Sequence, residues 1–270
     1  MWPLVAMENT LFTDPNLDWP QRCATVAAAG FAGVYATPYP LLDADFHRLR
    51  DLAHEPRRHG LFLEAVYASL DLGQPAGAEA NARVRRLFAE AEGAPRIELS
   101  FKCSESGALP PDVDGEICAR LEPLLALAER RGFTVALYPH SFYPLQAPFH
   151  AERIVQRMAH PRLSYLFATS HVYAVASAAE TASQLLACSS RIASFNVCGC
   201  RRPPPPAKCA HSPLDEGDLP LAPLFWILAA GGYRGSVIVQ GHGWNGDLPA
   251  MLRRCVVAAQ KLFPAALVAR

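Results

Sequence analysis

Histidines and one tyrosine recur at the ends of short apolar stretches of the chain. His140, His171 and His242 each follow such a stretch, and Tyr138 and Lys102 end two of them. Imidazole exchanges protons near neutral pH, while phenol and ammonium groups donate hydrogen bonds to a developing negative charge. The set predicts a general acid–base site, with His140 and His171 moving protons and Tyr138 and Lys102 stabilising an oxyanion. Each histidine taken singly could equally be a structural residue with satisfied hydrogen bonds.

A further catalytic base could come from Glu64, which lies inside the apolar stretch 61–67. If this carboxylate points into the mouth of the site, it is the best carboxylate base that remains there. A carboxylate on a buried strand needs a partner in any case, so a structural salt bridge or polar contact is the alternative.

Several polar and aromatic side chains near the same strand ends could bind a substrate. Trp244 and Tyr173 could stack on a sugar face or an aromatic ring, or could simply pack in the core or at the rim. A basic segment around Arg201 could recognise a carboxylate or phosphate on the ligand, or could be a solvated loop. The predicted substrate-binding residues are Asn196, Gln240, His242, Trp244, Tyr173, Tyr143 and Arg201, with Arg202 and Lys208 as further basic groups.

Three thiols and an imidazole lie within 14 residues of one predicted loop, at Cys198, Cys200, Cys209 and His211. These groups could form a tetrahedral zinc site. Their spacing differs from the paired C-x2-C of established zinc motifs, and the run Pro203–Pro206 stiffens the segment. A proline-stiffened loop with incidental thiols is therefore the favoured interpretation, and the zinc site is the alternative.

Eight apolar stretches alternate with amphipathic ones along the whole chain, which predicts eight strands and eight helices. Glycine ends several of the helices and supplies a left-handed C-cap. This alternation predicts a parallel sheet, either closed as a barrel or open and doubly wound. Because no Gly-rich phosphate loop follows the first stretch, where residues 8–13 contain no glycine, the (β/α)8 TIM barrel of one domain over residues 1–270 is favoured. The strands are expected at 4–7, 33–37, 61–67, 96–101, 134–138, 163–167, 192–197 and 236–240, and the helices near 18–30, 43–59, 79–93, 112–131, 148–159, 174–189, 218–231 and 247–262.

Five segments, in order along the chain, resemble the xylose isomerase-like barrels, a superfamily of sugar isomerases and epimerases, dehydroshikimate dehydratases and endonuclease IV. They are AAAGFAGVY (27–35), VALYPH (135–140), FATSH (167–171), HSPLDEGD (211–218) and GYRGSVIVQ (232–240). The resemblance implies the barrel fold and a site at the carboxyl ends of the strands.

The resemblance also implies a divalent metal held by Glu, Asp, His and Glu on strands five to eight. Here Tyr138, Ala168, Asn196 and Gln240 stand at those positions. Alanine offers no donor, an amide oxygen is neutral, and a phenol is largely protonated at pH 7. We therefore expect no metal at the family position and no other cofactor. A divalent metal (Mn, Mg or Zn) is expected only if the alignment slips on these strands.

The expected function is an isomerase- or epimerase-like activity on a small polyhydroxylated or cyclic carbonyl compound. Proton transfer without a metal would carry out the epimerisation, isomerisation or dehydration, the last being a lyase reaction. The alternative is a non-catalytic, sugar-binding pseudoenzyme, or a partner subunit of a related active enzyme.

The composition limits the classes of binding partner that are expected for this protein. The 270 residues are 51% hydrophobic and carry 25 basic and 25 acidic side chains. A formal charge of zero gives no field to attract a polyanion, so nucleic acid and an anionic membrane are not expected as partners. No apolar run reaches the length of a membrane span, and the first residues do not resemble a signal peptide. A cytoplasmic protein with a small-molecule substrate is expected, and a homo-oligomer is compatible with the sequence.

Overall fold

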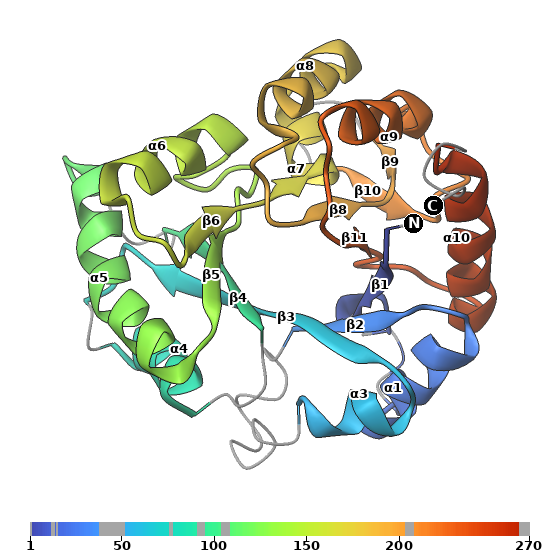
Figure 1. The fold of residues 1–270 in the computed structure, drawn as a ribbon, viewed down its shortest axis with the longest axis horizontal. Helices are drawn as coiled ribbons and strands as arrows, with labels where there is room; N and C mark the ends of the chain where they lie inside the picture. Colours follow the sequence, from blue (N-terminus) through green and yellow to red (C-terminus); the bar gives the residue numbers. More distant parts are fainter. Residues whose placement is uncertain are drawn as a thin grey trace.

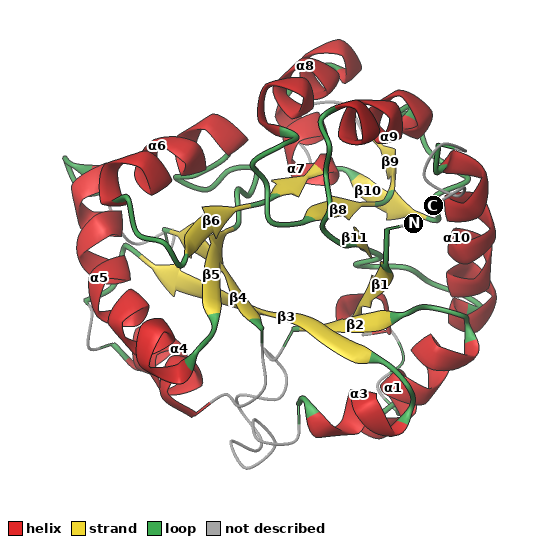
Figure 2. Cartoon of the chain, in the orientation of Figure 1, coloured by secondary structure: helices red, strands yellow, loops and turns green. Residues whose placement is uncertain are grey.

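Short apolar segments form a parallel sheet that curves round into a barrel (Figures 1 and 2). The computed structural model describes residues 2–11, 14, 16–37, 52–75, 78–90, 95–103, 109–202 and 208–264. The described strands of this sheet are β1 (Leu4–Met7), β2 (Gly33–Ala36), β3 (Phe62–Asp71), β4 (Arg96–Lys102), β5 (Thr134–Leu137), β6 (Leu163–Tyr165), β7 (Phe167–Ala168), β8 (Phe195–Val197) and β11 (Val237–Val239).

The order of the strands is that of a nearly closed barrel. It runs β6-β5-β4-β3-β2-β1-β11-β8-β7, and neighbouring strands of this sheet pair in parallel. Only Leu166 separates β6 from β7, so these two pieces act as one interrupted strand that brings the two edges together. The predicted (β/α)8 barrel is confirmed.

The longer helices surround the strands in Figure 2 and cover their outer face. The described helices, the short ones included, are the 3-10 helix η1 (Glu8–Leu11), α1 (Trp19–Ala28), α3 (His54–Arg58), α4 (Glu79–Glu90), α5 (Val113–Arg131), α6 (Pro148–Met158), α7 (Thr169–Val175), α8 (Ala178–Cys188), α9 (Leu221–Ala230) and α10 (Leu248–Leu262). No helix in the described part of the chain combines the length and apolar character that a membrane crossing requires.

Helix α5 shows how sequence pattern becomes packing. Its buried side chains are the apolar stripe that the helical period predicts, from Ile117 to Ala128. Asp112 caps the first turn by accepting from the backbone N–H of Gly115 at 2.8 Å. The helix ends at Gly132, whose φ of 83° is the left-handed conformation of a C-cap. The adjoining strand β5 then begins at Thr134.

Two expectations about the elements are wrong in detail. The helix expected over 174–189 is two helices, because Ser177 and Glu180 form a capping box that starts α8. The loop expected after the seventh strand contains an antiparallel hairpin, β9 (Gly199–Arg201) with β10 (Ala210–Ser212). The run Pro203–Pro206 and most of the helix expected at 43–59 lie outside the described residues, which include only α3 from that helix.

Candidate functional site

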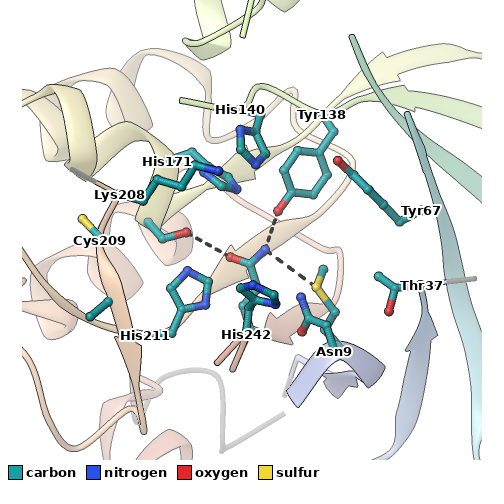
Figure 3. Close-up of a pocket in the computed structure, with 14 residues that line it drawn as sticks. Asn9, Thr37, Tyr67, Tyr138, His140, His171, Lys208, Cys209, His211 and His242 are labelled. Atoms are coloured by element: carbon teal, nitrogen blue, oxygen red, sulfur yellow. Dashed lines mark hydrogen bonds between the residues drawn. The ribbon is translucent and has the colours of Figure 1, made fainter. Parts of the chain in front are cut away.

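A cavity of about 320 Å³ opens at the carboxyl ends of the strands. This is the end at which barrel enzymes place their catalytic residues. Figure 3 shows the side chains that converge on it. The lining residues are Met7, Asn9, Thr37, Tyr67, Tyr138, His140, Ser170, His171, Lys208, Cys209, Ala210, His211, Gln240 and His242.

His140 follows β5 and has a defined tautomer. Its Nδ1 lies 2.8 Å from the backbone carbonyl oxygen of Ser141. A carbonyl oxygen can only accept a hydrogen bond, so Nδ1 carries the proton and Nε2 keeps its lone pair. Tyr143 stacks on the imidazole with ring centroids 4.0 Å apart and so holds the ring orientation. His140 is therefore an oriented proton acceptor at the cavity wall.

His171 lies beside His140, although it comes from a different element. It is on helix α7, which begins directly after β7. The two imidazole centroids are 3.8 Å apart, and the Oγ of Ser141 lies 3.2 Å from Nδ1 of His171. Ser141 thus contacts both histidines, one through its carbonyl and one through its hydroxyl. The sequence prediction that His140 and His171 share one site is consistent with this geometry.

Burial keeps these imidazoles neutral at pH 7. Removal from water lowers the pKa of His140 to about 4 and that of His211 to about 4. The pKa of His171 is also well below its usual value, first through burial and then through the nearby His140, His211 and Lys208. Neutral imidazoles can accept protons from a substrate, whereas imidazolium ions could not.

Tyr138 and Gln240 are hydrogen-bonded to each other inside the cavity (Figure 3). The Nε2 of Gln240 donates to the phenol oxygen of Tyr138, and the Oε1 of Gln240 accepts from Ser170 Oγ at 3.3 Å. Burial raises the pKa of the Tyr138 phenol well above its usual range, although the neighbouring amides of Asn196 and Gln240 act in the opposite direction. The phenol therefore stays protonated and is a hydrogen-bond donor at neutral pH.

The residues at the family's metal positions do not fit a hard divalent cation. Such ions select anionic oxygen or neutral imidazole donors. Tyr138 is a protonated phenol, Ala168 has no donor, and Asn196 and Gln240 offer neutral amides. The side-chain oxygen of Gln240 already accepts from Ser170. Across the described residues, no group of three or more His, Cys, Asp or Glu side chains is arranged to hold a metal ion.

Two predicted catalytic residues do not reach the cavity. Glu64 lies at the opposite, amino-terminal end of the barrel, where its Oε1 is 2.6 Å from Arg96 and its Oε2 accepts from Ser236 at 2.8 Å. The catalytic reading of Glu64 is therefore wrong, and the structural ion pair is the correct one. Lys102 ends β4 and is half-buried, but it is not among the residues described around the cavity.

The predicted substrate-binding residues divide into two groups. Gln240 and His242 line the cavity, whereas Asn196 is fully buried on β8 against the Tyr138 phenol, and Tyr143 stacks behind His140. Asn196 and Tyr143 therefore lie behind the lining, and the other three predicted residues lie farther from it.

Those three residues pack elsewhere. Trp244 is 2% exposed and lies so close to Gly241 that a Cβ there would meet its ring at 2.5 Å, so it packs in the wall. Tyr173 carries the Arg202 guanidinium 4.4 Å from its ring centroid. Arg201 is exposed, 3.7 Å from Glu216. The packing interpretation is thus the correct one for Trp244 and Tyr173.

The thiols cluster, but His211 does not join them. Cys198 and Cys200 have sulfur atoms 3.3 Å apart, and Cys200 also contacts Cys209. His211 instead faces His242, at 6.5 Å between ring centroids, and lies apart from the Cys209 sulfur in Figure 3. Contact between the thiols raises the pKa of Cys200 and Cys209, which keeps them protonated. This arrangement gives no support to the zinc alternative.

Sequence reasoning missed part of the wall. Tyr67 packs edge-on against Tyr138 with centroids 5.2 Å apart, and its hydroxyl lies 2.7 Å from Ser100 Oγ. The expected strand 61–67 ends at Tyr67, so the residue was available to a search of strand ends, although β3 continues to Asp71. Asn9 and Thr37 follow β1 and β2, so the rule that sites lie at strand carboxyl ends could have found them. Ser170 lies within the FATSH segment, next to His171.

Comparisons with known proteins agree with the fold. The model of the xylose isomerase-like TIM barrel family matches residues 23–255. No curated protein sequence matches the chain. Among solved structures, 3-keto-D-glucoside 4-epimerase from E. coli is similar with a TM-score of 0.73 and 14% identity, over 97% of this chain and 100% of that one.

Two further structures extend the comparison. D-allulose 3-epimerase from Methylomonas sp., in complex with D-allulose, has a TM-score of 0.74 and 14% identity over 97% of each chain. A xylose isomerase-like TIM barrel/4-hydroxyphenylpyruvate dioxygenase fusion protein has a TM-score of 0.76 and 14% identity, over 97% of this chain. This chain spans only 42% of that fusion protein. At these identities the likeness shows the fold alone.

Proposed function

The chain belongs to the xylose isomerase-like TIM barrel family, and we propose that it catalyses metal-independent proton transfer on a small polyhydroxylated or cyclic carbonyl compound. The observation that supports this most strongly is the pairing of an oriented base with a protonated phenol. His140 keeps a free Nε2 because Nδ1 is engaged by Ser141, and Tyr138 keeps its proton because it is buried. Both side chains line one cavity.

Each residue has a defined part in the proposed reaction. His140 Nε2 removes the proton from the carbon next to the substrate carbonyl, and the carbonyl oxygen becomes an enolate oxygen. The Tyr138 hydroxyl donates a hydrogen bond to that oxygen as its charge develops. Gln240 supports this role because it donates to the phenol oxygen and so leaves the phenol proton for the substrate.

The fate of the enolate after the first proton transfer decides which product is formed. When the deprotonated carbon carries a hydroxyl, the enolate oxygen takes up a proton, that hydroxyl gives one up, and return of the His140 proton to the former carbonyl carbon gives isomerisation. Return of a proton to the original carbon from the opposite face gives epimerisation, and His211 and His242 lie apart from His140 in Figure 3. When the His140 proton instead goes to a hydroxyl on the next carbon beyond the enolate, that hydroxyl leaves as water, which gives dehydration. All three outcomes share the first proton transfer.

Solvent exchange tests this shared step whichever product is formed. The protein is incubated in D2O with D-allulose, D-fructose and a 3-keto-glucoside, and deuterium at the carbon next to the carbonyl is followed by NMR. We expect exchange by the wild type and a loss of about 100-fold or more in His140→Asn, whose amide can still donate to the Ser141 carbonyl. His54→Asn is the control, because His54 is exposed on α3.

Two results would overturn the proposal. One is exchange that continues unchanged in His140→Asn. The other is a sugar that raises the melting temperature of the wild type by binding but never exchanges its hydrogen. That second result would identify the non-catalytic sugar-binding protein, which keeps the cavity without the reaction.

A further inference from the structure

The titratable side chains described around the cavity include basic groups but no carboxylate. Four histidines and Lys208 line it, and no Asp or Glu is among the residues described there. Lys208 is the only Lys or Arg in that lining, and the described part of the chain gives it no carboxylate partner. In Figure 3 its side chain extends towards His171 and His140. A single positive charge therefore faces the cavity, and the described residues of its lining supply no anion to balance it.

The neighbouring imidazoles respond to this charge. Lys208 is among the groups that lower the pKa of His140 and of His171, after burial in both cases. Positive charge is thus disfavoured at several points of the same wall, which is the electrostatic pattern of a site completed by an anion. Nδ1 of His211 is also buried and has no hydrogen-bond partner among the described residues.

We propose that the substrate carries a carboxylate, which Lys208 binds at the mouth of the cavity, so that the protein acts on a sugar acid or keto acid rather than on a neutral sugar. This inference rests on the proposed function, whose substrate class it narrows. A carboxylate matches the one cation that the described lining offers. A phosphate of about two negative charges leaves a second charge unpaired there.

The other basic residues of the segment do not share this role. Arg202 donates to the backbone carbonyls of Tyr173 and Ala176, and its guanidinium lies over the Tyr173 ring. Arg201 is exposed and faces Glu216, outside the cavity. The sequence suggested that this basic segment recognises an anion. Of its three basic residues, Lys208 is therefore the one that we assign to this role.

Bound carboxylate would also improve the proposed base. A negative charge next to His140 and His171 favours their protonated forms and raises their pKa towards neutrality. A base works best when its pKa lies near the working pH. Substrate binding and proton abstraction are then coupled through the same wall of the cavity.

Calorimetric binding of matched pairs tests the proposal. The probes are D-glucuronate against D-glucose, D-galacturonate against D-galactose and D-gluconate against D-glucitol, with D-glucose 6-phosphate as the phosphate arm. At least one acid is expected to bind ten times more tightly than its neutral partner. Lys208→Met should weaken that acid roughly tenfold to a hundredfold and leave the neutral sugar unchanged.

Two control variants test whether the effect requires a positive charge at position 208 or only a positive charge somewhere in this segment. Lys208→Arg should retain most of the preference for the acid, and Arg201→Met, which removes the same charge outside the cavity, should leave it intact. Equal affinity for acid and neutral sugar, a preference that survives Lys208→Met, or no binding of any pair below 10 mM overturns the proposal. Tighter binding of the sugar phosphate than of every acid overturns the assignment to a carboxylate.

These outcomes are distinct from failure of the proposed function. Hydrogen exchange on a neutral ketose with no preference for acids would keep the proton-transfer chemistry and reject the carboxylate. A Lys208-dependent preference for acids with no hydrogen exchange would do the reverse.

Discussion

Gln240, which follows β11, donates a hydrogen bond to the phenol oxygen of Tyr138, which follows β5. Two of the positions that the family resemblance assigns to metal ligands are thus bonded directly to each other. Neither side chain is an anion at neutral pH, because one is an amide and the other a buried phenol with a raised pKa. The centre of the site is a neutral hydrogen-bonded pair at positions where the family resemblance implies a charged ligand set.

Tyr138→Phe tests the oxyanion role. Removing one donor to a developing oxyanion costs about 100- to 1,000-fold in kcat, so hydrogen exchange should fall by that order. Stability should fall by about 1–3 kcal/mol, because Gln240 Nε2 loses its acceptor. The control is Tyr165→Phe on β6, which is outside the cavity lining. Full activity in Tyr138→Phe would show that the phenol does not stabilise the oxyanion.

Arg96 is expected to stabilise the fold and to take no part in the proposed reaction. It lies between Glu64 at 2.6 Å and Glu98 at 3.0 Å, at the amino-terminal end of the barrel, and Ser194 also donates to Glu98. Arg96→Met should lower the free energy of unfolding by about 3–5 kcal/mol, because two buried carboxylates lose their partner. Urea denaturation measures the loss, with Arg86→Met on the exposed face of α4 as the control.

Glu64→Gln gives the complementary result. It leaves Arg96 paired with Glu98 and removes the excess negative charge, so the free energy of unfolding should change by about 1 kcal/mol or less. Hydrogen exchange should stay within about threefold of the wild type, because Glu64 is remote from the cavity. A large loss of exchange in a stable Glu64→Gln variant would restore the catalytic role that the sequence suggested.

The buried histidines predict how stability depends on pH. The pKa values of His140 and His211 are about 4 in the folded protein, whereas an unfolded histidine titrates near 6.5. Between these values the unfolded chain binds more protons, so stability falls as the pH falls. The loss is up to about 1.4 kcal/mol per pH unit for each histidine.

Urea denaturation at pH 7, 6 and 5 checks this dependence. Below pH 5 carboxylates also titrate, so that range is left out. His140→Asn should reduce the slope by about one proton. Equal stability of the wild type at pH 7 and pH 5 would contradict the burial of neutral imidazoles.

Much of the fold could be predicted from sequence because strand alternation, helical periodicity and glycine caps are local signals. The apolar stripe of α5 and the end of that helix at Gly132 follow directly from such signals. The break between α7 and α8 could also have been found, since Ser177 and Glu180 are a readable capping box. The β9–β10 hairpin was not predicted, because four consecutive prolines between its strands argue against regular structure in this segment.

The site was predicted less completely, because which face of a strand a residue occupies depends on register. Tyr138, His140 and His171 were found through their positions after strands. Glu64 was misassigned as a cavity residue. Its ion pair with Arg96, a partner 32 positions away at the opposite end of the barrel, is not visible in the local sequence. Trp244 was misassigned because its packing depends on a close approach to Gly241.

Hydrogen exchange by metal-free protein tests the central claim most directly. The protein is treated with a chelator, its metal content is measured by elemental mass spectrometry, and exchange in D2O is compared before and after addition of Mn²⁺, Mg²⁺, Co²⁺ and Zn²⁺. The account predicts that wild-type exchange survives chelation, is unchanged by each added ion, and is lost in His140→Asn. Exchange that disappears on chelation and returns with a stoichiometric divalent ion would contradict it.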